Sequence, residues 1–445
     1  MHATLTDEVT AVLQQLIRNA CVNDGTAESG DEERSADFLR DYLEGPGLDL
    51  SVYEPTPGRR SLVARIEGSD PAAPSLLLMG HTDVVPVTAE NWRRDPFAAE
   101  LVDGEVWGRG AIDMLNLTAS MAVATRKLAD SGFRPRGTLI YLAVADEEAL
   151  GAHGAGWLVD HERDVVGADY VLTEFGGIPI PTAGGVKLPV IVGEKGSYWC
   201  RLVVKGTPGH ASQPLRTDNA LVTAAEVVRR IAEYRPETDI HDVWRRFVEG
   251  MDFPPELRDP LLDPDGLWDL VQTFPMVGLA RQAHACTHTT FAPTVVHGGT
   301  KTNVIPDRVE LELDIRTLPG QRGAEVREML DEALGDLAGS VEVVAPADDP
   351  STASPIDTPL WDTLQKVSGR LAPGSMTIPF LTVGATDARF FRRIGATAYG
   401  FGLLSERLNF DEFSSMFHGD NERVDQESLL LSTELWDAVA RDLLV

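Results

Sequence analysis

Apolar residues recur with two different spacings in the first part of the chain. Residues 5–17 and 32–43 have the spacing of amphipathic helices, and the second stretch opens on acidic residues that suit a helix N-terminus. Runs of nearly continuous apolar residues, which are typical of strands covered on both faces, follow at residues 61–66, 75–79, 138–145 and 170–173. A helical stretch at residues 114–128 completes the order strand, helix, strand, which predicts an α/β sandwich.

The pattern changes near residue 196, where strands with alternating polar positions begin. In order, it predicts a strand, a helix, two strands, a helix and a strand, at residues 198–205, 219–234, 287–297, 308–316, 324–334 and 341–344. This is the order of a small ferredoxin-like α+β module. The alternation Val-Glu-Leu-Glu-Leu-Asp-Ile at residues 309–315 indicates that one face of its sheet is wet or meets another subunit.

The module is predicted to interrupt a larger domain. We expect the first part of that domain at residues 1–195, the inserted module at residues 196–348 and the second part at residues 349–445. The tract at residues 236–282 is irregular and rich in Pro, Asp and Trp, and we interpret it as an insertion with some helix.

The composition favours an acidic, soluble enzyme. The chain has 445 residues, 43% of them hydrophobic, which is enough for the cores of two domains. Its net charge of -30 repels polyanions, so neither nucleic acid nor a membrane is expected as a partner. No stretch approaches the roughly 18 apolar residues of a membrane span, and the start lacks the pattern of a signal peptide, so a cytoplasmic location is expected. Three widely spaced cysteines indicate neither a disulfide framework nor a cysteine zinc site.

His81 and Asp83 follow the apolar run at residues 75–79. Residues two apart in an extended chain project to the same side, and a carboxylate so placed can accept the second N–H of a metal-bound imidazole. Taken alone, the pair is better explained by a histidine that is solvated or buried in the core. The preceding apolar run favours a position in the crevice at the carboxyl ends of the strands.

Carboxylates follow the next two apolar runs. Asp146, Glu147 and Glu148 come directly after residues 138–145, and Glu174 comes directly after residues 170–173. Like charges this close together are costly without cations, although a solvated acidic loop and a surface glutamate are the simpler explanations.

Asp113 and His418 supply the remaining candidates. Asp113 follows a Gly-Arg-Gly turn and precedes a predicted helix, where it either caps that helix or bridges two metals. Two divalent cations carry four positive charges, and Asp113, Glu148, Glu174 and one hydroxide return four negative ones. Such a pair can activate a bridging water, with Glu147 left to shuttle its proton. Imidazole and carboxylate ligands suit two Zn²⁺ ions, and Co²⁺ or Mn²⁺ fits the same set.

The motifs resemble those of the dinuclear zinc family that contains aminoacylases, glutamate carboxypeptidases, acetylornithine deacetylase and succinyl-diaminopimelate desuccinylase. The resemblance covers nearly the whole chain. It rests on the segments at residues 80–86, 108–113, 146–151, 206–212, 303–306, 314–320 and 418–422, together with Glu174. It implies a zinc-peptidase-like α/β/α catalytic domain with an inserted lid or dimerisation domain.

The same resemblance implies roles for individual residues. One metal is held by His81, Asp113 and Glu174, and the other by Asp113, Glu148 and His418. Asp83 orients His81, and Glu147 is the general base.

In the inserted domain, the resemblance implies that His210 stabilises the oxyanion, commonly in the active site of a partner subunit. It also implies that Asn303 and Arg316 contact substrate oxygen and the substrate carboxylate. The simpler alternatives are an exposed loop histidine for His210 and a partner of neighbouring acids for Arg316. The segment at residues 384–390 resembles a loop close to the substrate, with Thr386 and Arg389 as candidates.

These observations predict a two-metal hydrolase that cleaves an amide or peptide bond next to a free carboxylate, as an N-acyl amino acid amidohydrolase, a carboxypeptidase or a dipeptidase. The expected partners are a small-molecule substrate and a second copy of the chain in a homodimer. Two alternatives stay open: a two-metal phosphoesterase, since paired cations also suit phosphoryl transfer, and a metal-binding protein without catalysis.

Overall fold

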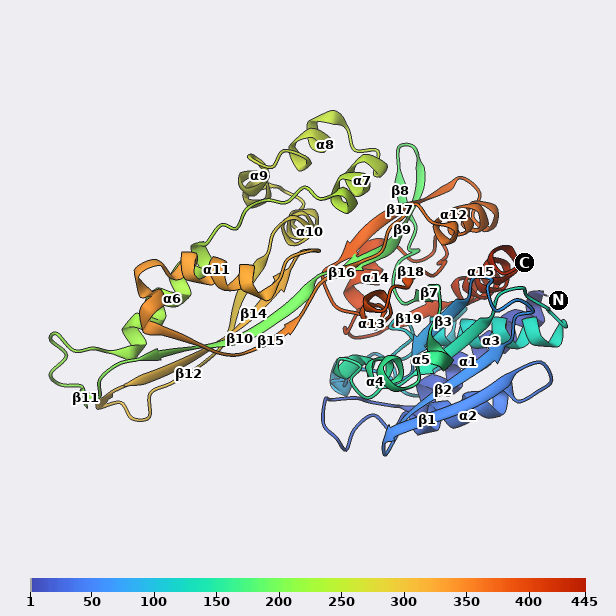
Figure 1. Cartoon of the computed structure of the whole chain (residues 1–445), viewed down its shortest axis with the longest axis horizontal. Helices are drawn as coiled ribbons and strands as arrows, with labels where there is room; N and C mark the ends of the chain where they lie inside the picture. Colours follow the sequence, from blue (N-terminus) through green and yellow to red (C-terminus); the bar gives the residue numbers. More distant parts are fainter. Residues whose placement is uncertain (1) are drawn as a thin grey trace.

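The computed structural model describes residues 2–445, which form two main sheets with their covering helices and two smaller sheets (Figure 1). The larger sheet runs β1-β2-β6-β3-β7-β18-β9-β16, and two further strands, β8 and β17, pair with β9. The bounds of its strands are β1 Asp49–Thr56, β2 Arg59–Ile66, β3 Leu76–His81, β6 Leu139–Val144, β7 Tyr170–Thr173, β8 Ile180–Thr182, β9 Gly185–Glu194, β16 Thr352–Ala353, β17 Ser375–Thr382 and β18 Thr397–Gly400.

The centre of this sheet is buried on both faces. Every residue of β3 and β6 is buried, because alternate side chains enter two separate apolar clusters. One cluster lies under α1 His2–Asn19, α2 Glu33–Leu43, α3 Leu115–Asp130, α12 Pro359–Leu371 and α15 Gln426–Leu443. The other lies under α4 Ala155–His161, α5 Arg163–Val166 and α13 Ala388–Arg393. The predicted α/β sandwich is therefore confirmed.

Smaller elements border the larger sheet. A three-stranded sheet consists of β4 Glu100–Val102, β5 Glu105–Trp107 and β19 Arg423–Asp425. The short helices are α14 Phe410–Met416, η1 Ala89–Asn91 and η2 Glu147–Ala149. Within the described residues, no helix has both the length and the apolar character that a bilayer span requires.

The second sheet belongs to an inserted module that we call the lid. Its elements are β10 Gly196–Lys205, α6 Ala220–Glu233, β12 Thr290–Gly298, β14 Arg308–Thr317, α11 Gly323–Leu334, η3 Gly335–Ser340 and β15 Val341–Asp349. The strands pair antiparallel in the order β12-β14-β10-β15, which is the expected ferredoxin-like arrangement. The domain limits at residues 196 and 348 stay a prediction.

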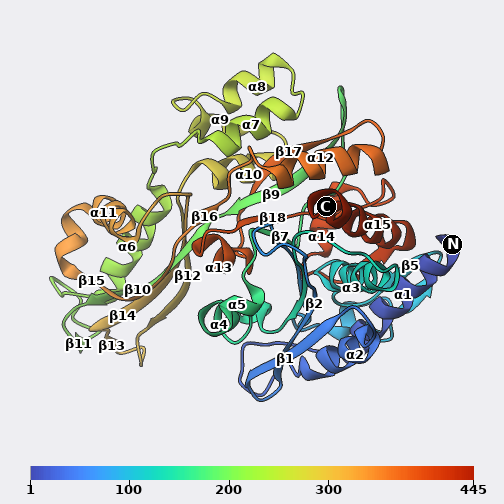
Figure 2. The same ribbon diagram turned by 45° about the vertical axis from the view of Figure 1, so that its right-hand side comes forward.

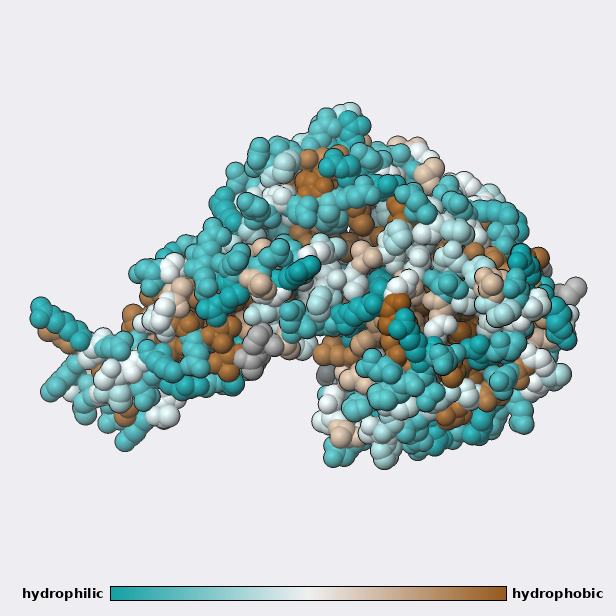
Figure 3. All heavy atoms as spheres, in the orientation of Figure 1, coloured by the Kyte–Doolittle hydropathy of each residue, from teal (hydrophilic) through white to brown (hydrophobic). Residues whose placement is uncertain are grey.

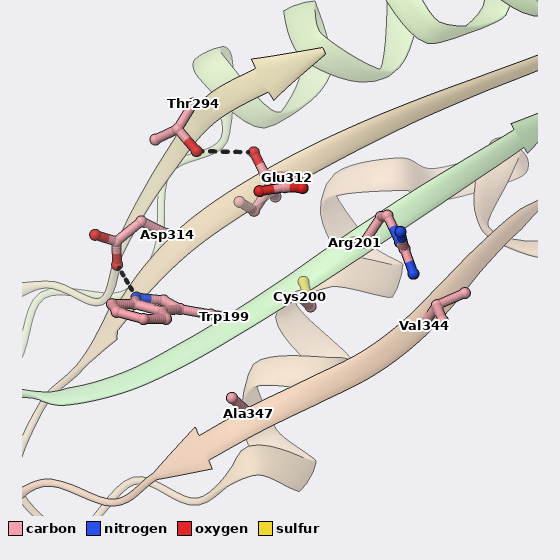
Figure 4. A pocket seen from close by; sticks show the side chains of 9 residues that line it. Trp199, Cys200, Arg201, Thr294, Glu312, Asp314, Val344 and Ala347 are labelled. Atoms are coloured by element: carbon pink, nitrogen blue, oxygen red, sulfur yellow. Dashed lines mark hydrogen bonds between the residues drawn. The ribbon is translucent and has the colours of Figure 1, made fainter. Parts of the chain in front are cut away.

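The two faces of the lid sheet differ as the alternation predicts. Val309, Leu311, Leu313 and Ile315 pack under α6 and α11 in one apolar cluster. The polar residues between them lie on the open face, part of which Figure 4 shows. Figure 3 shows that the molecule is hollowed between the lid and the larger domain, below the narrow connection that joins them.

The tract at residues 236–282 is more helical than its sequence suggested. It contains α7 Asp242–Gly250, α8 Pro255–Leu261 and α9 Leu267–Thr273, and the start of α10 Val277–Thr287. Trp244 and Phe247 of α7 share an apolar cluster with Ile378 and Leu381 of β17. The tract thus leaves the lid, packs on the larger domain and returns to the lid at β12 (Figure 2). Sequence periodicity underestimated the helix content of this tract, because its helices are short and are separated by proline and glycine.

Candidate metal centre

Three parallel strands bring the predicted ligands to one edge of the larger sheet. β3 pairs parallel with both β6 and β7, so the carboxyl ends of all three strands point the same way. His81 is the last residue of β3, and Glu174 follows the last residue of β7 directly. Glu147 and Glu148 open the short helix η2 shortly after β6 ends. The sequence pattern therefore predicted the convergence correctly.

The first group of ligand atoms comes from His81, Asp113 and Glu174. The His81 Nε2 atom lies 3.2 Å from Asp113 Oδ1 and 3.6 Å from Glu174 Oε2. All three residues are buried, with exposures of 1%, 5% and 2%. The structure thus places one imidazole nitrogen between two carboxylate oxygens in the interior.

The second group comes from Asp113, Glu148 and His418. The His418 Nε2 atom lies 3.2 Å from Asp113 Oδ2 and 3.3 Å from Glu148 Oε2. Asp113 therefore faces one histidine with each carboxylate oxygen, which is how a carboxylate bridges two metals. Its side chain does not cap α3, so the simpler alternative for Asp113 does not hold. His418 is exposed and forms the solvent side of the site.

The donor set fits two divalent cations. The buried oxygens Glu148 Oε1 and Glu174 Oε2 have no hydrogen-bond partner among the residues that the structure describes. A buried carboxylate oxygen without a partner is costly, and a coordinated cation removes that cost. The His81 Nδ1 atom lies 2.9 Å from the Asp83 carbonyl oxygen, which can only accept, so Nδ1 carries hydrogen. Nε2 is then the nitrogen that faces the ligand position, as in His-carboxylate metal sites.

The protonation of the site follows from its crowded acids. Burial and the charge of neighbouring Glu174 hold the pKa of Glu147 well above its usual value, and burial raises the pKa of Glu174 to about 8. Hydrogen bonds to Asp113 and Glu148 raise the pKa of His418 to about 10. For Asp113, the bonds from His418 and His81 outweigh burial and lower the pKa. Without cations, the site therefore retains protons that bound metals would displace.

Asp83 holds both His81 and the loop that carries Glu147. The Asp83 carboxylate lies 3.5 Å from His81 Nδ1, whereas the Asp83 backbone carbonyl oxygen lies 2.9 Å from the same atom. The imidazole is therefore oriented mainly by the backbone. The carboxylate oxygens accept hydrogen bonds from the backbone N–H groups of Glu147, at 3.3 Å, and Glu148, at 3.0 Å. Asn23 donates a further bond of 2.9 Å to Asp83, a contact that sequence reasoning missed.

Glu422 shapes the turn that carries Asp113. Its buried carboxylate accepts from the backbone N–H groups of Gly110, Ile112 and Asp113, at 2.9, 2.6 and 2.9 Å. The Arg109 guanidinium donates a fourth bond of 3.0 Å. The sequence contained this residue only as the end of the His418 motif, and its function in positioning Asp113 became visible in the structure.

The three lid residues lie apart from this centre. His210 in β11 Gly209–His210 pairs with β13 Val304–Ile305, next to Asn303, at the outer end of the lid (Figure 1). β14 is ten residues long, which at about 3.3 Å per residue separates that end from the hinge by roughly 30 Å. Within one chain, His210 and Asn303 are therefore not brought to the metal centre.

Arg316 lies at the other end of β14, near the hinge. Its guanidinium donates 2.8 Å and 3.2 Å bonds to Asp314 and stacks on Trp199 at 5.6 Å. Asp314 also accepts a 3.0 Å bond from the Trp199 indole (Figure 4). In this arrangement Arg316 is the partner of a neighbouring acid, as its simpler alternative states, and its contact with substrate stays a prediction.

Comparison with known proteins gives consistent matches over most of the chain. Residues 77–442 match the sequence model of peptidase family M20/M25/M40. The chain is 28% identical over 429 residues to the N-fatty-acyl-amino acid synthase/hydrolase PM20D1 of Xenopus tropicalis, covering 92% of this chain and 82% of the relative. It is 26% identical over 404 residues to aminoacylase-1 of Mus musculus, covering 90% of this chain and 87% of the relative. The fold matches that of the M20 family metallo-carboxypeptidase Sso-CP2 from Sulfolobus solfataricus, with a TM-score of 0.74 and 18% identity over 98% of this chain and 99% of that one.

Proposed function

Because this chain belongs to peptidase family M20/M25/M40, we propose that it hydrolyses the amide bond of an N-acyl amino acid or short peptide with a free carboxylate. The family resemblance expected from the motifs is confirmed, and the chain is a metal-dependent hydrolase of amide or peptide bonds. One observation supports the two-metal form of the proposal above others: two groups of ligand atoms share Asp113, with Glu147 beside them in neither group.

The proposed ligands are His81, Asp113 and Glu174 for one metal and Asp113, Glu148 and His418 for the other. Zn²⁺ suits this set best, and Co²⁺ or Mn²⁺ can replace it. When bound, the cations polarise the substrate carbonyl and acidify water.

The proton transfers are the task of Glu147. In our proposal it accepts a proton from the attacking water and delivers it to the leaving nitrogen. Asp83 keeps the carboxyl in place through the backbone N–H of Glu147.

The lid supplies the remaining groups, and in our proposal it does so from a partner subunit. His210 and Asn303 stabilise the oxyanion and Arg316 binds the substrate carboxylate. The distance of His210 from the metal centre of its own chain supports action in a homodimer. β12 supports the dimer itself: it is an edge strand of the lid sheet whose Val296 is 60% exposed, and an unpaired edge pairs readily with a second copy.

Mixed dimers test the role in trans. A Glu147→Gln chain and a His210→Ala chain are each expected to be inactive as homodimers. Coexpressed, they form heterodimers in which one site has both an intact Glu147 and a partner with an intact His210. Recovery of part of the activity supports the proposal, and no recovery, with the heterodimer shown by affinity tags, contradicts it.

The substrate class is tested by release assays. The two relatives are named an N-fatty-acyl-amino acid synthase/hydrolase and an aminoacylase, so we propose N-fatty-acyl and short N-acyl amino acids as the first substrates to test, followed by dipeptides. The zinc-loaded enzyme should release amine from members of this panel and no phosphate from phosphoesters. Glu147→Gln should abolish turnover and keep its metal. Turnover by that variant would reject the assigned base, and phosphate release would favour the phosphoesterase.

We also propose a cytoplasmic location. All three cysteines are buried and free, as in proteins of a reducing compartment. Fractionation with an antibody to the native protein tests this, and recovery outside the cytoplasm contradicts it.

A further inference from the structure

Arg389 is a buried charge that contacts distant parts of the chain. It is 3% exposed. Its Nη1 donates to the Thr386 carbonyl oxygen at 2.5 Å and its Nη2 donates to the Leu150 carbonyl oxygen at 2.8 Å. Its Nε lies 2.9 Å from Asp349 Oδ2, an ion-pair contact without the geometry of a hydrogen bond. The guanidinium therefore contacts two segments that are distant in the sequence, at Leu150 and Asp349, besides the turn at Thr386 that precedes its own helix.

One of these segments is the loop that carries Glu147 and Glu148, which we call the base loop, residues 146–151. Leu150 closes its turn by donating a 2.8 Å bond to the Glu147 carbonyl oxygen. The φ angle of Leu150 is +73°, so this residue leaves the turn in the left-handed conformation with its carbonyl facing Arg389. Asp83 holds the loop at its beginning, through two backbone N–H groups. Arg389 holds it at its end.

Another segment is the hinge of the lid. Asp349 is the last residue of β15, where it pairs with Ser197 of β10. The chain then returns to the larger sheet at β16, which pairs with β9. Asp349 thus lies where the lid sheet joins the larger domain, and its carboxylate is shared between Arg389 and Arg393.

We propose that Arg389 is a positioning residue that fixes the base loop relative to the lid hinge. The proposal rests on the proposed function, in which Glu147 is the base and Glu148 a metal ligand. Arginine is suited to this task because its planar fork presents donors in several fixed directions at once. A lysine keeps the charge near Asp349 but has a single nitrogen, which cannot reach Leu150, Thr386 and Asp349 together.

Arg393 offers a matched control. It lies on the same helix, α13, and its guanidinium binds the same Asp349 carboxylate and the Pro350 carbonyl oxygen, the latter at 2.9 Å. None of the contacts of Arg393 described by the structure is with the base loop. Comparing substitutions at the two arginines therefore separates the bond to Leu150 from the general stabilisation of the hinge.

The experiment compares Arg389→Met, Arg389→Lys and Arg393→Met at equal metal content. Misplacement of a catalytic group by about 1 Å costs on the order of 100-fold in rate, so both Arg389 variants should lose about 10- to 100-fold in kcat with little change in KM. Arg393→Met should stay within about threefold of the parent, as expected for a partly exposed pair. An equal loss of kcat at both arginines would show that Arg389 serves stability alone and would overturn the proposal.

Hydrogen exchange provides a second readout that needs no substrate. Peptides that span residues 144–154 should exchange faster in both Arg389 variants than in the parent or in Arg393→Met, with and without zinc. Peptides from β3 and β6 should be unchanged, which shows that the fold is intact. If Arg389→Met does not fold, Arg389→Lys alone decides the outcome. Unchanged exchange in the base loop contradicts the proposal even if the enzyme is active, whereas a parent without hydrolase activity contradicts the proposed function instead.

Discussion

Replacing Glu422 by glutamine tests how the metal centre is held together. The carboxylate accepts four hydrogen bonds, two at each oxygen: Ile112 and Asp113 N–H at Oε1, and Gly110 N–H and Arg109 at Oε2. Glutamine has nearly the same shape but one acceptor oxygen, and its NH₂ group faces two donors. Glu422→Gln therefore changes charge and hydrogen bonding with little change in volume.

The magnitude follows from what loses its partner. If the NH₂ group replaces Oε2, Gly110 N–H and the Arg109 guanidinium, which is 3% exposed, lose their acceptor. Breaking a buried ion pair by removing one partner costs about 3–5 kcal/mol of folding free energy. The turn at residues 110–113 then loses part of the carboxylate that accepts its backbone N–H groups. Loss of a group that orients a metal ligand typically reduces metal affinity about 10- to 100-fold.

The assay is zinc competition with a chromophoric chelator, together with thermal unfolding, both at pH 8. Glu427→Gln is the control, because it makes the same chemical change at an exposed residue on the same segment of chain. We expect weaker zinc binding and a lower unfolding midpoint for Glu422→Gln, and neither for Glu427→Gln. If Glu422→Gln binds zinc as tightly as the parent, the turn holds Asp113 in place without the Glu422 carboxylate, and the reasoning is refuted.

Three further predictions follow from other parts of the structure. Burial lowers the pKa of Lys195 to about 7, below the unfolded value of about 10.4, so the unfolded chain binds more protons between these values. The stability of the parent relative to Lys195→Met should therefore rise from pH 7 to pH 10 in thermal unfolding, and a constant difference would contradict the burial of a neutral amine. Val296→Lys, at the exposed edge of β12, should shift the enzyme toward monomer in sedimentation and lower its activity; a stable, active dimer would exclude this edge as the interface. Chelation should lower the unfolding midpoint and zinc should restore it, since Asp113, Glu148 and Glu174 repel one another in a buried site; an unchanged midpoint would argue against bound metal.

Much of the fold could be predicted from local patterns. The nearly continuous apolar runs identified β2, β3, β6 and β7 because strands covered on both faces need apolar residues at successive positions. The alternation in β14 identified a sheet with one polar face, because successive side chains of a strand point to opposite faces of the sheet. β9 and the helices of the tract at residues 236–282 were not predicted as such, because their packing on β17 and on one another, rather than their periodicity, stabilises them.

Candidate ligands of the metal centre were also identified from the sequence, and the structure brings them together. His81 ends one parallel strand, and Glu148 and Glu174 follow two others. Because the carboxyl ends of parallel strands share one edge, the positions of these residues in the sequence imply that they meet in space. Only the tertiary structure decided which groups hold those ligands. Glu422 lies 309 residues from Asp113, and Arg389 lies 239 residues from Leu150. A hydrogen bond depends on the position of two atoms to within tenths of an ångström, and between distant segments that position is set by the packing of the whole domain, which no local pattern of residues contains.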